Sequence, residues 1–148
     1  MTLTYLTRED SINALRKMKS FHDECREIYK RHGFNLMDNL GRRNILLSQA
    51  QEKYFAEEIA KNYADVKNDG KTGEPDIFIG QINKELECKL TSRTKNGAIS
   101  FQTDYTTLAA KQKLDYLYVV ASEEFDKFAV VHYRGLTIDD YREPSNGS

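Results

Sequence analysis

The stretch that decides the fold is EPDIFIGQINKELECKL, residues 74–90. Within it, residues 76–79 are rich in β-branched and aromatic side chains and residues 84–90 alternate between polar and apolar positions, and both patterns are typical of strands. The glycine and asparagine between these two segments favour a tight turn. We therefore expect a hairpin in which Asp76 lies opposite Glu87, with their Cβ atoms about 5 Å apart.

The rest of the chain predicts helices before and after this hairpin. A first helix is expected over residues 7–33, beginning at a capping box led by Thr7. Residues 34–47 are rich in turn-forming side chains, and a second helix is expected to begin at Ser48, with Gln51 as its capping partner. The later elements are a short strand, a helix and two long strands, over residues 98–101, 103–113, 116–120 and 128–133. This order predicts an α/β fold with a mixed sheet.

The composition is typical of one globular domain, so we expect residues 1–148 to form a single domain. No apolar run reaches the length that a membrane span needs, and the first residues lack the pattern of a secretory signal, which predicts a cytoplasmic protein. The formal net charge of −1 argues against a non-specific nucleic-acid coat protein. A local basic stripe is nevertheless compatible with DNA binding.

The chemistry predicted for the hairpin depends on Asp76, Glu87 and Lys89. Side chains two positions apart share one face of a strand, so Lys89 is expected beside Glu87. Two carboxylates, with waters and a phosphate oxygen, are usual surroundings for Mg²⁺, and a lysine ammonium can hold an attacking water. Each residue alone also fits a solvated strand face. Their combination with Pro75, after a glycine-containing loop, favours a site.

The residues Pro75-Asp76 and Glu87-Cys88-Lys89 resemble the signature of the PD-(D/E)XK nuclease superfamily. The core of that superfamily is a helix, a three-strand meander, a helix and further strands in a mixed sheet, and the predicted elements from Ser48 onward follow that order. The resemblance implies a restriction-endonuclease-like core with an N-terminal helical extension.

The same resemblance implies roles for individual residues. Asp76 and Glu87, with the backbone carbonyl of Cys88, are the implied ligands of Mg²⁺, for which Mn²⁺ can substitute, and no nucleotide cofactor is implied. Lys89 is the implied catalytic lysine. Many members add a glutamate from the preceding helix, for which Glu52 is the first candidate. The second candidate is Glu58.

From Glu85 onward the chain also resembles the PvuII-like type II restriction endonucleases. In that group a polar segment before the second helix contacts base edges, and the matching candidates here are Ser100, Gln102, Thr103 and Asp104. The alternative is that this segment caps the helix. Basic residues near the site are expected to contact phosphates, namely Arg42, Arg43, Arg93, Lys95, Lys111 and Lys113.

The expected function is a Mg²⁺-dependent type II restriction endonuclease acting on a specific double-stranded DNA sequence. Reading a palindrome requires a two-fold homodimer, for which the helical extension over residues 1–47 is a candidate interface, unless it packs into the core. Residues 48–134 form the expected catalytic core and residues 135–148 a polar tail. The alternatives are a Holliday-junction resolvase or DNA-repair nuclease of the same fold, and a non-catalytic DNA-binding module.

Overall fold

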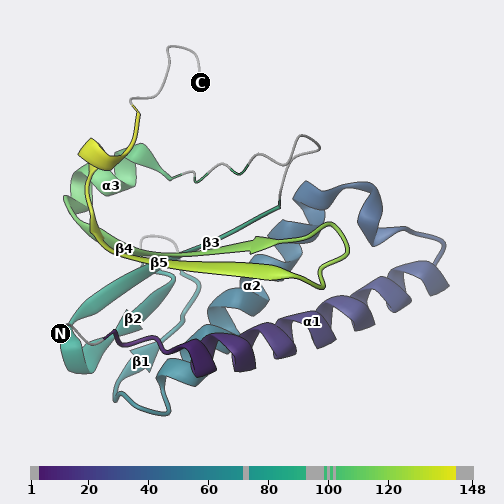
Figure 1. The fold of residues 1–148 in the computed structure, drawn as a ribbon, viewed down its shortest axis with the longest axis horizontal. Helices are drawn as coiled ribbons and strands as arrows, with labels where there is room; N and C mark the ends of the chain where they lie inside the picture. The colour runs from purple at the N-terminus through teal and green to yellow at the C-terminus, as the bar shows by residue number, and fades with distance from the viewer. Residues whose placement is uncertain (1–3, 72–73, 93–98, 100, 102, 143–148) are drawn as a thin grey trace.

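The computed structural model describes residues 4–71, 74–92, 99, 101 and 103–142 (Figure 1). Three short 3₁₀ turns join its helices and strands, η1 (Leu36–Asp38), η2 (Gly80–Ile82) and η3 (Ile138–Asp140). The helices are α1 (Arg8–Arg31), α2 (Leu40–Ile59) and α3 (Tyr105–Lys111). The strands are β1 (Val66–Lys67), β2 (Ile77–Ile79), β3 (Lys84–Ser92), β4 (Leu114–Ala121) and β5 (Phe128–Leu136).

The five strands form one mixed sheet in the order β1-β2-β3-β4-β5. Neighbouring strands are antiparallel except for β3 and β4, which are parallel. A parallel pair needs a long crossover connection, and residues 93–113, which include α3, supply it. The predicted α/β class with a mixed sheet is therefore confirmed.

The hairpin has the predicted register. Ile77 is paired with Leu86 and Ile79 with Lys84, so one further step along the ladder places Asp76 opposite Glu87. The turn passes through η2. Gly80 is required there because a Cβ at this position would lie 2.0 Å from a carboxylate oxygen of Asp65.

The first helix begins where the sequence predicts. The Thr7 side chain accepts a hydrogen bond from the Asp10 N–H at 3.0 Å, and the Asp10 carboxylate accepts one from the Thr7 N–H at 3.0 Å. The buried face of α1 includes Ala14 and Met18, which pack into the main core. The helix is thus part of the core, which is the alternative that the sequence left open to a dimer interface.

The predicted start of the second helix at Ser48 is wrong. The helix begins at Leu40, because the side chain of Asn39 accepts a hydrogen bond from the Arg42 N–H at 3.1 Å and caps it. Ser48 lies inside α2, where its hydroxyl donates to the carbonyl of Ile45 at 2.6 Å. The predicted boundary between an extension and a catalytic core therefore falls within one continuous helix.

The three-strand meander also differs from the prediction. Its first member is β1, which pairs with β2 and precedes the loop that leads to Asp76. The strand predicted over residues 98–101 is not observed at Ile99 or Phe101, and its other positions lie outside the described residues. The meander is therefore β1-β2-β3.

Two apolar clusters cover the two faces of the sheet. Figure 1 shows α1 and α2 on one side of the sheet and α3 on the other. The larger cluster joins the two long helices to the inner face and includes Phe55, Leu86 and Leu117. The smaller cluster includes Leu108 of α3 and Tyr118 of β4. Every residue of β4 is buried, as expected for a strand covered on both faces.

Candidate active site

Asp76 is held at the start of β2 by a backbone contact to the neighbouring strand. Its Oδ2 atom accepts a hydrogen bond from the Cys88 N–H at 2.9 Å. Because Cys88 stands between Glu87 and Lys89, this bond places the Asp76 carboxylate against the part of β3 that carries the other predicted residues. The side chain of Asp76 is half-buried.

Glu87 and Lys89 lie two positions apart on β3 and form a long ion pair. The Lys89 Nζ atom is 4.0 Å from the Glu87 Oε2 atom, and the two side chains are 35% and 19% exposed. Burial raises the pKa of Glu87, the negative charge of Asp76 raises it further, and the Lys89 ammonium lowers it. The net direction is upward, so the Lys89 ammonium does not fully offset burial and the charge of Asp76.

Glu52 of α2 completes a group of three carboxylates. Its pKa is raised to about 8, first by burial and then by the charge of Asp76 and a side-chain hydrogen bond to Asp76, with Glu87 contributing further. Near neutral pH, without a cation, the Glu52 carboxyl therefore holds a proton. The structure brings together all four residues that the sequence singles out for catalysis, Glu52, Asp76, Glu87 and Lys89.

The second glutamate candidate has a different environment. Glu58 is fully buried and forms an ion pair with Lys61.

Glu52 lies in the middle of α2 rather than in a first turn, because the helix begins earlier than predicted. The helix dipole therefore gives no reason for its position, whereas its contact with Asp76 does.

Gln51 is a residue of this site that the sequence analysis misassigned. Its side chain is fully buried, and its Nε2 atom donates to the carbonyls of Lys89 at 3.2 Å and Leu117 at 3.3 Å. The predicted role of Gln51 as a capping partner of Ser48 is wrong because both residues are inside α2. A glutamine that faces the core has no distinctive signal in the sequence.

The group fits a hard divalent cation by its chemistry. Burial and the charge of Asp76 raise the pKa values of Glu52 and Glu87, and a divalent cation among the three carboxylates would instead favour their ionised forms. In addition, the Oε1 atom of Gln51 is buried and has no hydrogen-bond partner among the described residues. Within the same part of the chain, no three His, Cys, Asp or Glu side chains are already arranged as ligands of one metal ion, so metal binding stays a prediction.

The segment predicted to contact bases is described only in part. Thr103 forms a hydrogen bond with the hydroxyl of Tyr116, and Asp104 caps α3 by accepting a hydrogen bond from the Thr107 N–H at 3.1 Å. Asp104 therefore caps α3, as the alternative prediction for this segment states. The other predicted DNA contacts in this region, Arg93, Lys95, Ser100 and Gln102, lie outside the described residues.

The two arginines at the start of α2 have opposite environments. Arg42 is exposed, which is compatible with a phosphate contact. Arg43 is fully buried, donates to the Ser92 hydroxyl at 3.0 Å and to the Glu123 carbonyl, and lies over the Phe125 ring at 5.1 Å. The prediction that Arg43 contacts DNA is therefore corrected, because its guanidinium joins α2 to the ends of β3 and β4.

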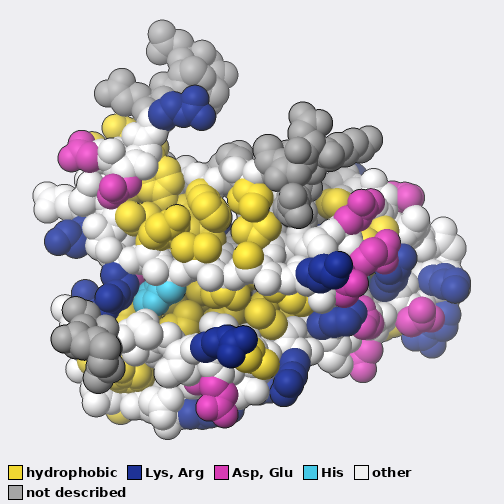
Figure 2. All heavy atoms as spheres, viewed as in Figure 1, with side chains coloured by type: hydrophobic (Ala, Val, Ile, Leu, Met, Phe, Trp, Pro, Cys, Tyr) yellow, Lys and Arg dark blue, Asp and Glu magenta, His cyan; other side chains and the backbone are white. Residues whose placement is uncertain are grey.

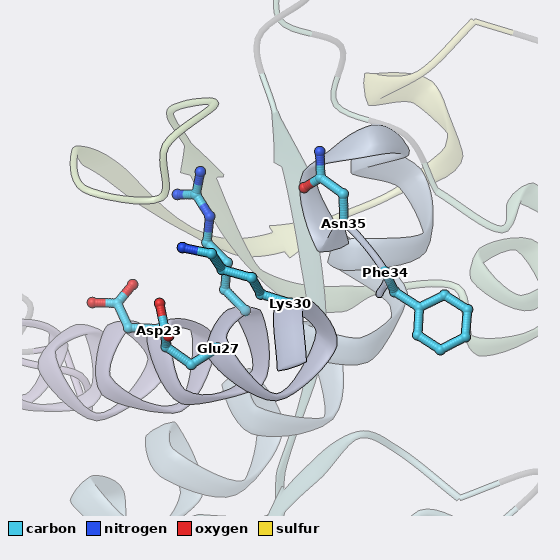
Figure 3. Close-up of a pocket in the computed structure, with 6 residues that line it drawn as sticks. Asp23, Glu27, Lys30, Phe34 and Asn35 are labelled. Atoms are coloured by element: carbon cyan, nitrogen blue, oxygen red, sulfur yellow. The ribbon is translucent and has the colours of Figure 1, made fainter. Parts of the chain in front are cut away.

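A hollow at the end of α1 (Figure 3) is lined by residues other than those of the carboxylate group. It has a volume of about 690 Å³ and is lined by residues of α1 and of the segment that follows, including Asp23, Lys30 and Phe34. Both charge signs line it, and Arg26 at its edge is paired with Glu124 at 2.9 Å. It therefore shows no preference for an anionic or a cationic ligand.

Comparisons with known proteins identify no relative: no family model, no curated protein and no solved structure matches this chain. Among the helices that the structure describes, none combines the length and hydrophobicity that a membrane crossing requires. The site therefore has to be interpreted from its own geometry and chemistry.

Proposed function

We propose that this chain is a Mg²⁺-dependent deoxyribonuclease that hydrolyses phosphodiester bonds in double-stranded DNA. The observation that carries the proposal is the carboxylate group of Glu52, Asp76 and Glu87, with Lys89 at 4.0 Å from Glu87. Neighbouring carboxylates with raised pKa values favour a divalent cation, and an adjacent ammonium favours an anionic substrate such as a phosphodiester.

The order of the elements supports the same proposal. A helix (α2), three antiparallel strands (β1 to β3), a crossover helix (α3) and a strand parallel to the third (β4) follow one another along the chain. This succession resembles the restriction-endonuclease-like core, and the four site residues occupy the helix and the hairpin where that resemblance requires them. A likeness of fold alone does not establish an activity, so the chemistry of the site carries the greater weight.

The residues of the chain have distinct parts in the proposed reaction. Asp76, Glu87 and the Cys88 carbonyl would hold the Mg²⁺ ion, which when bound polarises the scissile phosphate and lowers the pKa of water. Lys89 would orient the attacking water and offset the charge that develops on the phosphate oxygens. The hydrogen bond from the Cys88 N–H keeps the Asp76 carboxylate in place, and Gln51 fixes β3 at Lys89.

Within this class we propose a type II restriction endonuclease that acts as a homodimer. The support is the resemblance of the segment after Glu85 to the PvuII-like enzymes, in which a β-strand, a polar segment and a helix also follow one another. Thr103 and Asp104 lie at the start of α3, where that resemblance places the base contacts. A cleavage assay distinguishes this proposal from a junction resolvase and from a non-catalytic module.

The test is incubation of the purified chain with plasmid DNA of known sequence, in Mg²⁺ and in EDTA, followed by gel electrophoresis. Asp76→Asn is the inactive variant, and Asp69→Asn, which changes an exposed aspartate, is its matched control. Discrete Mg²⁺-dependent fragments support the type II proposal, and a smear supports a nuclease without sequence specificity. Intact plasmid and intact branched DNA, together with no heat of Mg²⁺ or Mn²⁺ binding, would contradict the proposed function.

A further inference from the structure

A second hollow lies where the parallel strands β3 and β4 begin. It has a volume of about 710 Å³ and opens to solvent, and the side chains that define its character are those of Tyr5, Lys84, Lys113, Asp115, His132 and Arg134. In Figure 2, Lys and Arg side chains lie beside a histidine in the hollowed part of this face, near the N-terminal segment. We refer to it as the basic hollow.

The cations of the basic hollow come from three different parts of the chain. Lys84 is the first residue of β3, Lys113 precedes β4, and Arg134 lies in β5. Like charges gathered on one concave surface repel one another, and the low-dielectric walls of a hollow increase the field that they produce. Such an arrangement favours an anion that neutralises them.

The carboxylate in the lining, Asp115, supplies one negative charge against three cations and therefore cannot neutralise all of them. Asp115 is 4% exposed, and its two oxygens accept hydrogen bonds from the Tyr5 hydroxyl at 2.6 Å and from the Gly135 N–H at 2.8 Å. Both donors are neutral, so these hydrogen bonds hold the carboxylate in place without cancelling its charge. The buried contact instead serves to join the N-terminal segment, β4 and β5 beneath the basic hollow.

The two lysines are exposed, and neither is paired with a carboxylate in the part of the chain that the structure describes. Glu85, the acidic side chain next to Lys84, is paired with Lys111 at 3.0 Å. Neither Lys84 nor Lys113 has an ion pair with any residue that the structure describes. The aliphatic part of the Lys113 side chain also lies across Gly135, where an added Cβ would be 3.3 Å from the Lys113 Cδ atom. This contact with the Gly135 backbone restricts the positions of the Lys113 ammonium.

We propose that the basic hollow binds a phosphate group through Lys84 and Lys113, and that this phosphate belongs to the backbone of DNA bound at the candidate active site. The second part rests on the proposed function. Lys84 is three residues from Glu87 on β3, about 10 Å along the strand, and because side chains alternate between faces it lies at the start of the strand on the face opposite to Glu87. Contacts of this kind fix the register of DNA without reading its sequence.

The first experiment tests the phosphate site without DNA. Inorganic phosphate is titrated into the ¹⁵N-labelled full chain at constant ionic strength, with chloride as the reference anion, and amide chemical shifts are recorded. We expect saturable shifts near Lys84, Lys113 and Gly135 in the wild type and their loss in the Lys84→Gln/Lys113→Gln variant. Lys127→Gln, an exposed lysine at the opposite end of β5, is the matched control and should keep them.

The absence of saturable shifts in the folded wild-type protein would overturn the inference, and so would shifts that the double variant retains. This readout does not depend on nuclease activity. It therefore tests phosphate binding in the basic hollow even if the DNA cleavage assay detects no activity.

The second experiment measures the affinity for a DNA duplex in EDTA as a function of salt concentration. Each phosphate contact removed lowers the slope of log K against log salt by about 0.9, so the double variant should show a shallower slope and weaker binding, whereas Lys127→Gln should match the wild type. Phosphate shifts combined with an unchanged DNA slope would assign the basic hollow to free phosphate and overturn its role in DNA binding. A shallower slope without any DNA cleavage would support the inference and contradict the proposed nuclease.

Discussion

Glu52 of α2 and Asp76 at the start of β2 lie close together, and the charge of Asp76 helps to raise the pKa of Glu52 to about 8. Burial is the largest cause of the shift and the charge of Asp76 the next. Two carboxyl groups can share such a contact only when one of them is protonated or when a cation lies between them. The pair therefore links the ionisation of the site to the binding that we propose for it.

The pH dependence of stability follows from this pair. The pKa of Glu52 is about 8 in the folded protein and near its ordinary value of 4.5 in the unfolded chain. The folded state therefore binds an additional proton between these values, and the free energy of unfolding of the metal-free protein should fall as the pH rises through this window. Glu52→Gln should reduce this fall, leaving the smaller contribution of Glu87, and should be more stable than the wild type above about pH 8. Urea unfolding in EDTA at several pH values measures the difference.

The control for that measurement is Glu57→Gln on the same helix. Glu57 is exposed, and hydrogen bonding to Lys53 lowers its pKa, so its ionised form is favoured in the folded state. Its substitution should give no gain at high pH. An equal gain in both variants would show that the effect is not specific to Glu52.

Asp76→Asn should strongly slow cleavage without unfolding the protein. The asparagine amide oxygen can still accept the hydrogen bond from the Cys88 N–H, so only the negative charge is lost. We expect the initial rate of plasmid cleavage in Mg²⁺ to fall roughly 10²- to 10³-fold, as when one electrostatic contribution to a transition state is removed. A variant that melts like the wild type and cleaves at the wild-type rate would remove Asp76 from the site.

Lys89→Met should separate catalysis from DNA binding. Methionine keeps much of the apolar stem and removes the ammonium that lies 4.0 Å from Glu87. Cleavage should fall roughly 10²- to 10³-fold, because the developing charge on the phosphate loses its partner. Binding of duplex DNA in EDTA, measured by fluorescence anisotropy, should stay close to that of Lys53→Met, which changes an exposed lysine of α2. Loss of binding in Lys89→Met alone would assign this residue to affinity instead.

Arg43→Met should destabilise the fold, whereas Arg42→Met should not. Arg43 is fully buried, and its loss leaves the carbonyl of Glu123 without this donor and removes one of the two donors to the Ser92 hydroxyl, the other being Asn44. Each unsatisfied group costs about 1–3 kcal/mol, whereas an exposed substitution usually changes stability by less than about 0.5 kcal/mol. Urea unfolding of the two variants gives the comparison. Equal stabilities would contradict the structural role of Arg43.

Local signals in the sequence were sufficient for the hairpin and for the start of α1. The alternation of side chains and the turn between the strands place Asp76 opposite Glu87, and the observed pairing of Ile77 with Leu86 confirms that register. The capping box at Thr7 needs only residues three positions apart. Both features depend on neighbours along the chain, and such neighbours are visible in a sequence.

The same local signals were misleading at the start of α2 and at β1. Asn39 and Gly41 are common in turns, but asparagine is also a favourable helix cap, and the structure uses it in that way. The strand β1 contains only Val66 and Lys67, which is too short for any alternation to be visible. It is recognised only by its pairing with β2.

The sequence by itself determined the α/β class, the hairpin register and the set of Asp76, Glu87 and Lys89, because each of these depends on the period of a strand and the chemistry of a turn. Only the tertiary structure decided which of these residues meet partners from elsewhere. Segments far apart in the chain determine three features. These are the position of Glu52 beside Asp76, the burial of Arg43 under the β4–β5 turn and the convergence of Lys84 with Lys113. The physical reason is that burial, pKa shifts and ion pairs are set by distance in space, which packing of the core fixes and residue spacing does not reveal.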